Sequence, residues 1–499
     1  MKRLLISFLL LPLLTVAQLK VGHIFSDKMV LQRDMPITIW GKAAPGSNVL
    51  LAFGAKTKTV VAKKDSSWKV SFSPQKANSK PQAISVSSGK EKIQLNNILI
   101  GDVWVCSGQS NMEWPMQREK HWKQEKLVAQ QPLIRFNNPP PAGRGVFGVA
   151  YTDSLNKRLN KDDFYCWTSW RTTDSNSVKD MSAVAYYFAK RIVESEGVPI
   201  GLINLSIGGA PIETFIRKEA LQSSKQFAKK AKGDWLENTH LPAWIIERGR
   251  QNVGSNIDGY KDELGLNHAY KPGFAFEAGI QPLLSFPIKG VLWYQGESNA
   301  QEMERVEEYT ALSALMIEDY RRQWKQPRLP FYYVQLSSID TLRYKGHFWP
   351  QFRDEQRKMM LLVPFSGMVV TSDIGALHDV HPTNKKDVGE RLARWALYQT
   401  YKKAIVPSGP LPLQSNYANG KLTVYFQYAN GLRTADGKSL RGFSLDGKNE
   451  VEATIVGDTI VIASEQKPAF VFYGWKPFAD ANMVNEEGLP ASTFKIKVK

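Results

Sequence analysis

The stretch DVWVCSGQSNMEWP, from Asp102 to Pro115, decides how the chain is organised. Its apolar run, Val103 to Cys106, predicts a short buried strand that breaks into the small polar residues SGQSN. Open α/β sheets bind ligands at the carboxyl ends of their strands, so a polar loop at this point indicates a functional site. Ser110 lies in the tight part of the turn and is a candidate nucleophile. The alternative is a serine that only caps a helix.

The chain begins with the pattern of an export signal. Lys2 and Arg3 precede an apolar run from Leu4 to Val16, and the residues up to Ala17 fit a cleavage site. We therefore expect residues 1–17 to be a signal peptide and the protein to be periplasmic or extracellular. The apolar run is shorter than a membrane span requires, and no later stretch is predicted to be a transmembrane helix.

Composition sets limits on size, partners and metal sites. The 499 residues allow about two to four domains. The formal charge is +18, or +16 without Lys2 and Arg3, which is compatible with acidic glycans or with solubility alone. Nucleic acid is not an expected partner of an exported protein. Two cysteines allow at most one disulfide and exclude a Cys-rich metal site, and the histidines are scattered, so we expect neither metal nor cofactor. Oligomeric state stays open.

Two β-rich modules are predicted to flank a central domain. Residues 18–97 contain short β-type segments such as ITIWG and WKVSF between turn residues, which is typical of a β-sandwich. Residues 408–499 return to this pattern, with KLTVYF and DTIVIAS and hairpin signals such as Asn419-Gly420. The catalytic domain is therefore expected at residues 98–407.

The central region alternates strand and helix patterns. The predicted strands include PIGLINLS, GVLWYQGES, LPFYYVQL and Gly367 to Ser372, and the predicted helices are Met181–Glu196, Glu304–Trp324, Gln351–Leu362 and Asn384–Tyr401. This alternation indicates an α/β domain with a parallel sheet covered on both faces. Residues 215–276 are polar and show no clear strand. We interpret them as an insertion over the carboxyl edge of the sheet, a candidate lid, with a plain surface excursion as the alternative.

Four polar loops, each after a predicted strand, supply the parts for acyl transfer. A serine hydroxyl needs a nearby base, and His381 in HDVHPTN is the best candidate, although a loop histidine often has only a structural role. The oxyanion of such a reaction needs donors fixed in advance. The candidates are the backbone N–H groups of Ser110 and of Gly208 or Gly209, and the side-chain amide of Gln295. A glycine pair can also be a plain turn, and a glutamine at a strand end can be structural.

These loops resemble a known family. GDVWVCSGQSNMEWP, SIGGAPIETF, WYQGES and DVHPTNKKDVGERLA are similar to four blocks of the sialate O-acetylesterases, carbohydrate esterases of the SGNH (GDSL-like) hydrolase superfamily. The closing YGWKPFADANMVNEEGLPASTF is similar to their C-terminal segment, so the resemblance covers nearly all the mature chain. It implies a three-layer SGNH-type α/β fold, Ser110 as nucleophile and His381 as base and then acid. It also implies an oxyanion hole made by the Ser110 amide, Gly208 or Gly209, and Gln295.

Two features depart from common hydrolase patterns. GQSNM is not the G-x-S-x-G elbow of the α/β-hydrolases, which disfavours that fold. The superfamily's usual Asp-x-x-His is absent because His378 stands three residues before His381. Asp379 is our first choice for the acid that orients His381, Asp373 is the second, and a backbone carbonyl is the third possibility.

Other polar and aromatic residues of the loops have two interpretations each. Weak candidates for binding sugar hydroxyls, which could instead brace the turns, are Asn111, Glu213, Glu297 and Asn299. Trp114 and Trp293 are candidate stacking platforms for a sugar ring, or core residues.

The resemblance favours a serine esterase that removes O-acetyl groups from sialic acids through an acetyl-serine intermediate. An alternative with the same chemistry is an esterase for acetylated xylan or another plant glycan. An alternative of a different class is a non-catalytic glycan-binding protein. Ester hydrolysis separates this last alternative from the first two, and a panel of acetylated glycans separates the first two from each other.

Overall fold

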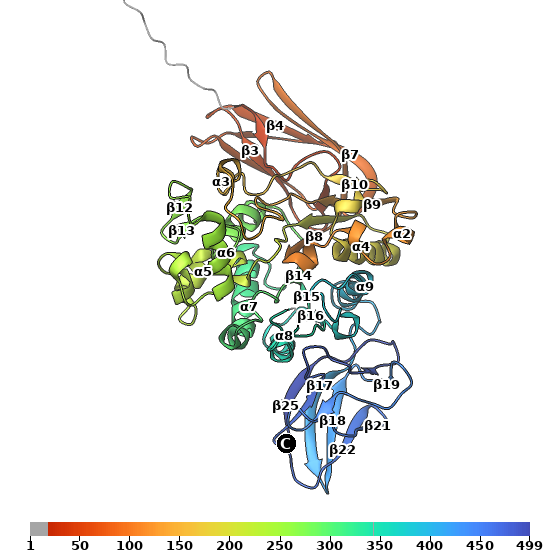
Figure 1. The fold of residues 1–499 in the computed structure, drawn as a ribbon. Helices are drawn as coiled ribbons and strands as arrows, with labels where there is room; N and C mark the ends of the chain where they lie inside the picture. The colour runs from red at the N-terminus through yellow and green to blue at the C-terminus, as the bar shows by residue number, and fades with distance from the viewer. Residues whose placement is uncertain (1–17, 343) are drawn as a thin grey trace, which may run out of the picture.

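The chain folds into two β-rich parts on either side of a part in which helices surround a sheet (Figure 1). The structure is a computed structural model that describes residues 18–342 and 344–499. The expected signal peptide, residues 1–17, lies outside these ranges. Among the helices within them, none has both the length and the apolar character that crossing a membrane requires.

The N-terminal part contains two facing groups of strands. β1, β3 and β6 form one antiparallel sheet, while β4 pairs with β5 and β7, and β7 pairs with β8. Phe53 of β4 contacts Phe72 of β6 with ring centroids 5.7 Å apart, so apolar side chains from both groups share one core. The strands are β1 (Lys20–Val21), β2 (Val30–Gln32), β3 (Ile37–Lys42), β4 (Asn48–Phe53), β5 (Lys56–Val61), β6 (Ser67–Phe72), β7 (Asn78–Ser88) and β8 (Glu91–Gly108).

The strand β8 joins the N-terminal part to the central sheet. Its first half pairs with β7, and its second half pairs in parallel with the strands β11 (Ile200–Asn204) and β14 (Gly290–Tyr294). The predicted buried strand at Val103 to Cys106 is confirmed, but the prediction that it is short is wrong, because β8 runs from Glu91 to Gly108. The Asn96-Asn97 pair does not end the strand: Asn97, at φ +56°, lies where the β7–β8 register shifts, and the strand continues past it. The predicted domain boundary at 97/98 falls inside β8, and the division into domains stays a prediction.

Asp102 connects β8 to the N-terminal part and to the end of the central part. Its buried carboxylate accepts hydrogen bonds from Gln32 at 3.0 Å, from Arg33 at 2.9 and 2.8 Å, and from the Tyr401 hydroxyl at 2.8 Å. A buried carboxylate is stable only when its oxygens are well satisfied, and here the partners come from two distant segments of the chain. The central sheet is thereby fixed to the segment that follows β2.

The central sheet is mixed, with the strand order β10-β9-β11-β8-β14-β15-β16. β9, β11, β8, β14, β15 and β16 run parallel, and β10 runs antiparallel to β9 at one edge. β8 is thus a central strand, and its carboxyl end lies next to the ends of β11 and β14. The strands not yet given are β9 (Gln131–Asn137), β10 (Arg171–Thr173), β15 (Phe331–Val334) and β16 (Ser366–Val369).

Helices cover both faces of this sheet. Adjacent residues of a strand point to opposite faces. In β15 the Tyr332 hydroxyl pairs with Thr400, just beyond α9, whereas the Tyr333 hydroxyl donates to the Gln356 carbonyl of α8. α4 packs beside α9, and α7 packs beside α8, as Figure 1 also shows. The helices are α1 (Ser110–Glu113), α2 (Trp122–Glu125), α3 (Asp153–Asn156), α4 (Ala183–Glu196), α5 (Lys218–Ser223), α6 (Ala243–Val253), α7 (Met303–Gln323), α8 (Trp349–Leu362) and α9 (Lys386–Trp395).

The predicted long helices are confirmed, with one difference at the end of the domain. The predicted helix Asn384–Tyr401 is α9 followed by a π-helical turn over Ala396–Thr400. Residues 215–276 hold α5 and α6 and bury Trp235, and they also contain a short strand pair, β12 (Lys261–Asp262) and β13 (Gly265–Leu266). The expectation that this region has no strand is therefore wrong. Asp-Glu-Leu-Gly was too polar to be recognised as a hairpin.

The C-terminal part is β-rich and has its own apolar core, which includes Val424, Phe443 and Phe494. It attaches to the central part through Arg353 of α8, whose buried guanidinium donates to the carbonyls of Gly474 and Lys476. Its strands are β17 (Leu411–Ala418), β18 (Lys421–Gln427), β19 (Arg433–Thr434), β20 (Phe443–Ser444), β21 (Thr454–Val456), β22 (Thr459–Ala463), β23 (Phe470–Tyr473), β24 (Met483–Val484) and β25 (Phe494–Lys497).

Candidate active site

Ser110 is the first residue of α1, and only Gln109 separates it from Gly108 at the carboxyl end of β8. The turn between them depends on Gly108, whose φ of +128° is unfavourable for other residues. A Cβ atom at this position would also lie 2.1 Å from the Tyr294 carbonyl oxygen of β14. The chain therefore passes close to its neighbour strand and turns at once into a helix. This turn places Ser110 in the first helical turn, where backbone N–H groups have no acceptor within the helix.

The Ser110 hydroxyl is hydrogen-bonded to His381. The distance from Oγ to the His381 Nε2 is 2.8 Å, across 271 residues of sequence. His381 lies in the loop between β16 and α9, and its ring stacks on Trp114, with centroids 5.3 Å apart and planes at 19°. The two residues singled out as nucleophile and base are thus brought into contact. Trp114 packs against the base, and Trp293 is buried against Phe215 in the core.

Of the candidate acids, Asp379 is the one near His381. Its Oδ1 accepts the His381 backbone N–H at 2.8 Å and lies 3.5 Å from Nδ1 of the ring. Asp373 instead forms a two-point ion pair with Arg391, at 2.7 and 2.6 Å, and His378 pairs with Asp340 at 2.5 Å.

The surroundings of His381 favour its neutral form. Burial is the largest influence and lowers its pKa, and the ammonium of Lys385 lowers it further, while the Asp379 carboxylate opposes both. A neutral imidazole with Nε2 facing a serine hydroxyl can accept the hydroxyl proton. The arrangement therefore suits general-base activation of Ser110 near neutral pH.

The glycine pair after β11 lies beside Ser110. The Gly208 carbonyl accepts the Tyr270 hydroxyl, and the Gly209 carbonyl accepts the Ser298 hydroxyl, both at 2.9 Å. A Cβ atom on Gly208 would be 4.0 Å from the Ser110 Cβ. Fixed carbonyls also fix the orientation of the peptide groups, so this loop presents a rigid backbone next to the serine.

Glu113 and Arg144 occupy the space next to Gly208, and sequence reasoning did not single out either residue. The Arg144 Nε lies 2.5 Å from a Glu113 carboxylate oxygen. Burial raises the Glu113 pKa, and the guanidinium of Arg144 and the Gly208 N–H, which faces the carboxylate, oppose this rise. Both residues line a small hollow that Gly208 also borders, with Phe147, Tyr151 and Tyr270 on its other walls.

Gln295 lies under this loop with its amide already occupied. Its Nε2 donates to Asn299 at 2.8 Å and lies 3.2 and 3.3 Å from the oxygens of Gln109 and Ala210, and its oxygen accepts the Tyr309 hydroxyl at 2.8 Å. The side chain is fully buried. Gln295 therefore braces the loops after β8, β11 and β14, and its place in an oxyanion hole stays a prediction.

The four weak candidates for sugar binding are all buried and bonded to the protein. Asn111 donates to Glu297 and to the Val380 carbonyl, and accepts from Lys385. Asn299 donates to Glu213 at 3.0 Å. At most 1% of the surface of each is exposed, so the structure favours the bracing interpretation for Asn111, Glu213, Glu297 and Asn299.

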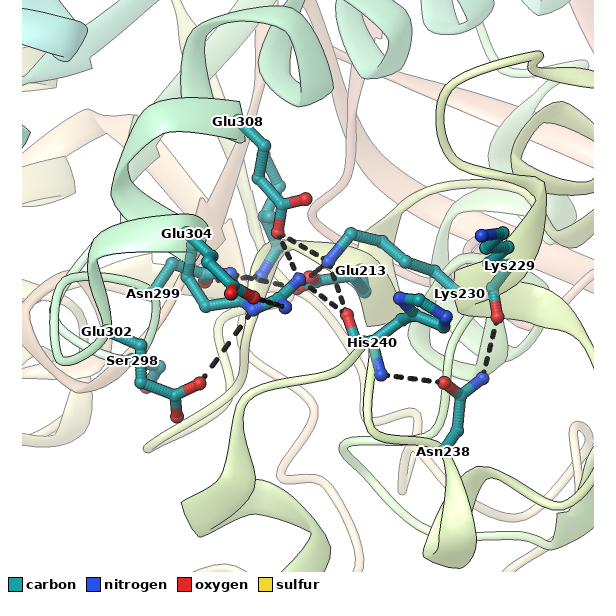
Figure 2. A network of polar contacts seen from close by, with 12 residues as sticks. Glu213, Lys229, Lys230, Asn238, His240, Ser298, Asn299, Glu302, Glu304 and Glu308 are labelled. Atoms are coloured by element: carbon teal, nitrogen blue, oxygen red, sulfur yellow. Dashed lines mark hydrogen bonds and ion pairs between the residues drawn. The ribbon is translucent and has the colours of Figure 1, made fainter.

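Glu213 belongs to a buried ionic cluster that Figure 2 shows. Lys230, 2% exposed, donates to Glu213 at 2.8 Å and pairs with Glu308 at 2.6 Å, and Arg305 pairs with Glu308 at 2.8 Å. Figure 2 also shows Asn299 beside this cluster. The cluster ties the segment after β11 to the insertion and to α7, which stabilises the base of the glycine loop.

The structure also bears on metal ligands and on the two cysteines. Across residues 18–342 and 344–499, no group of three or more His, Cys, Asp or Glu side chains is placed to hold a metal ion. Cys106 is buried in β8 as a core residue, Cys166 is exposed, and the two are not bonded to each other.

Comparisons with known proteins agree with this site. A family model described as carbohydrate esterase, sialic acid-specific acetylesterase, matches residues 274–398. The matched range includes Gln295 and His381 but not Ser110. The human sialate O-acetylesterase is 27% identical over 439 residues, which cover 81% of this chain and 76% of the human protein. The mouse sialate O-acetylesterase is 25% identical over 444 residues, with coverage of 82% and 79%.

A solved structure is similar over almost the whole chain. It is that of a carbohydrate acetylesterase from Xanthomonas citri, with a TM-score of 0.77 and 29% identity, covering 96% of this chain and 99% of the other. The likeness includes both β-rich parts and the central sheet. Together with the hydrogen-bonded Ser110 and His381, these similarities identify the chain as a carboxylic ester hydrolase that resembles the sialate O-acetylesterases.

Proposed function

We propose that this protein is a serine esterase that removes acetyl groups from sugar hydroxyls, with Ser110 as nucleophile and His381 as general base and acid. The observation that carries the proposal is the 2.8 Å hydrogen bond between Ser110 Oγ and His381 Nε2 at the edge of the central sheet. A hydroxyl in this position becomes nucleophilic as it transfers its proton to the imidazole.

In the first half of the reaction, Oγ attacks the carbonyl carbon of the acetyl ester while its proton moves to Nε2 of His381. The carbonyl oxygen takes up the negative charge. We propose that the backbone N–H groups of Ser110 and of Gly208 or Gly209 bind this oxyanion. Gln295 holds the loops in place, and its side-chain amide becomes a further oxyanion donor once it leaves its present hydrogen-bond partners. Breaking the bond to the sugar oxygen, which receives the proton from Nε2, leaves acetyl-serine and the free sugar.

In the second half, water attacks the acetyl-serine. Its proton moves to Nε2 as the new carbon–oxygen bond forms, and the oxyanion returns to the same donors. Breaking the bond between Oγ and the carbonyl carbon returns the proton to Ser110 and releases acetate. Asp379 is proposed to stabilise the transient imidazolium, since its carboxylate is near Nδ1.

The proposed substrate is an O-acetylated sialic acid on an exported or host glycan. The description of the family model and the names of the human and mouse relatives support it. The alternative is acetylated xylan or another plant glycan, which the similarity to a carbohydrate acetylesterase of Xanthomonas citri leaves open. A non-catalytic glycan-binding protein is disfavoured because the serine and histidine are intact and in contact.

The proposal extends to architecture and location. We infer an SGNH-type catalytic domain over residues 98–407 between two β-modules, at 18–97 and 408–499, and export by the segment before residue 18. The parallel strands covered by helices on both faces support the first inference. The pattern of residues 1–17 supports the second.

The test is Ser110→Ala, assayed on p-nitrophenyl acetate and on a panel of O-acetylated sialoglycans and acetylated xylan. We expect acetate release to fall by at least about 10³-fold while the circular dichroism spectrum is retained. Ser154→Ala on α3, an exposed serine, is the control and should keep full activity. Brief reaction of the wild type should also leave an acetyl group on the peptide that contains Ser110, measured by mass spectrometry. Unchanged activity in Ser110→Ala would overturn the mechanism.

A further inference from the structure

Lys385 is a buried lysine directly behind the proposed catalytic pair. None of its surface is exposed, and it immediately precedes α9, four residues after His381. Within the described ranges, no carboxylate lies within 4.0 Å of its ammonium group. Its hydrogen-bond acceptor is the neutral side-chain oxygen of Asn111. A charge in such a place is costly, so its retention calls for a physical reason beyond packing.

The contacts of Lys385 reach both members of the proposed pair. Its Nζ lies 5.6 Å from the centre of the Trp114 ring and 5.4 Å from that of Tyr294. Trp114 stacks on the His381 ring, and Asn111 is the residue next to Ser110 in α1. The ammonium is thus held between two aromatic faces and an amide, beside the serine turn and the histidine loop together.

Asn111 connects Lys385 to the backbone next to His381 by hydrogen bonds. A charged lysine donates hydrogen bonds but cannot accept them, so the ammonium of Lys385 bonds to Oδ1 of the Asn111 amide. The Nδ2 end then points to Glu297 and to the Val380 carbonyl, the latter at 2.9 Å. Val380 is the residue before His381. The orientation of one amide therefore links the turn that carries the nucleophile to the backbone that carries the base.

We propose that Lys385 is a positioning residue of the esterase site, which fixes His381 through Asn111 and Val380 and places a positive charge near the imidazole. This inference rests on the proposed roles of Ser110 and His381. Three charged groups face His381: Asp379 and Lys385 from its own loop and Arg118 from the segment after Trp114. Three carboxylates face Lys385, those of Glu297, Asp379 and Glu119.

The electrostatic part of the proposal has a definite sign. Burial lowers the pKa of Lys385 to about 7, and the three carboxylates limit this fall, so the group carries substantial positive charge below neutral pH. That charge lowers the pKa of His381. Removing it should raise the His381 pKa, and the acid limb of kcat/KM, where the base becomes protonated, should move to higher pH. A purely structural defect would lower activity equally at all pH values.

The experiment compares three variants on p-nitrophenyl acetate between pH 5 and 9. Lys385→Met removes the charge, and Lys385→Met with Glu297→Gln also removes the buried carboxylate that would be left without its countercharge. Lys386→Met is the matched control. Lys386 is the next residue in the chain, and its side chain is 41% exposed and faces Glu390.

For the two Lys385 variants we expect the acid limb to move up by roughly half a pH unit to one unit. We also expect kcat at its optimum to fall roughly tenfold as His381 loosens. Lys386→Met should match the wild type. Nitrogen NMR of the His381 ring should show the same rise in its pKa without reference to turnover.

An unchanged pH profile in the double variant, or a uniform loss of activity without a shift, would overturn the proposal. Either result would leave the proposed function intact, because that depends on Ser110→Ala. Activity retained by Ser110→Ala would remove the basis of both.

Discussion

One oxygen of Asp379 both accepts the backbone N–H of His381, at 2.8 Å, and lies 3.5 Å from Nδ1 of that histidine's ring. The first contact is a good hydrogen bond, and the second is longer than one. With 60% of its side chain exposed, the carboxylate is also well screened by solvent. Asp379 therefore shapes the loop as well as the ring, and it holds the ring less firmly than a buried acid would.

The first prediction concerns Asp379→Asn. We expect kcat/KM to fall by roughly 10- to 100-fold, well short of the loss of about 10⁴-fold seen when a buried triad acid is replaced. The Asp379 charge raises the His381 pKa, so its removal should shift the acid limb to lower pH, opposite to the effect of removing Lys385. The measurement is a pH profile of p-nitrophenyl acetate hydrolysis.

Asp373→Asn is the control for this prediction. Asp373 pairs with Arg391 rather than with His381, so its variant should keep the wild-type pH profile. If Asp373→Asn instead lowers activity and shifts the profile while Asp379→Asn does not, Asp373 takes the orienting role and our assignment is wrong.

The second prediction concerns Glu113→Gln. The Glu113 carboxylate faces the Gly208 N–H, which we propose as an oxyanion donor, so it competes for that donor and repels the developing charge. A neutral amide is a weaker acceptor, and we expect kcat to rise severalfold. The measurement is kcat of Glu113→Gln and of the wild type, from steady-state kinetics on p-nitrophenyl acetate. A fall in kcat would mean that the carboxylate assists the reaction, for example by holding Arg144.

The third prediction concerns the turn before Ser110. Gly108→Ala places a Cβ atom 2.1 Å from the Tyr294 carbonyl oxygen, at a φ of +128°, and neither strand can move without breaking its pairing. We expect a loss of at least about 3 kcal/mol in the free energy of unfolding, or no soluble protein. Gly89→Ala, at the β7–β8 turn with nothing within 4 Å, should cost only about 1 kcal/mol. Equal effects in urea unfolding would contradict the close approach of the two strands.

The fourth prediction concerns the buried ionic cluster. Lys230→Met leaves Glu213 and Glu308 without their shared cation, and we expect the free energy of unfolding to fall by about 3–5 kcal/mol. Lys229→Met, at the exposed neighbouring position in Figure 2, should change it by less than about 0.5 kcal/mol. Urea unfolding followed by tryptophan fluorescence measures both. A small effect of Lys230→Met would mean that water reaches the cluster.

The sequence was sufficient to predict the alternating central region and its long helices, because their patterns are local. Ser182 and Gly197 bound α4 by a side-chain cap and a left-handed residue, as their positions suggest. The length of β8 was not predictable, since its continuation depends on pairing with strands far away in the chain. The β12–β13 pair was missed because it is short and polar, and its contacts with Lys218 and Trp235 depend on the tertiary fold.

The candidate pair of Ser110 and His381 could be predicted because reactive residues at strand ends meet at one edge of a sheet. The functions of their neighbours could not. The side-chain amides of Gln295 and Asn111 can bind either a substrate or other protein groups. Only the structure shows that they are hydrogen-bonded within the protein, to Asn299 and Lys385 respectively. Glu113 and Arg144 are far apart in the sequence and come together only in the tertiary fold, so no sequence spacing predicts their ion pair.

The continuity of β8 has a consequence for how such an enzyme can be shortened or recombined. A fragment that begins at residue 98 would cut this strand within its pairing with β7 and before its pairing with β11, and would lose the Gln32 and Arg33 partners of Asp102. Ser110 would then follow a strand that has lost its N-terminal half. We expect the N-terminal strands and the hydrolytic centre to be inherited as one piece, so that exchange of the first module between relatives fails unless β8 travels with it.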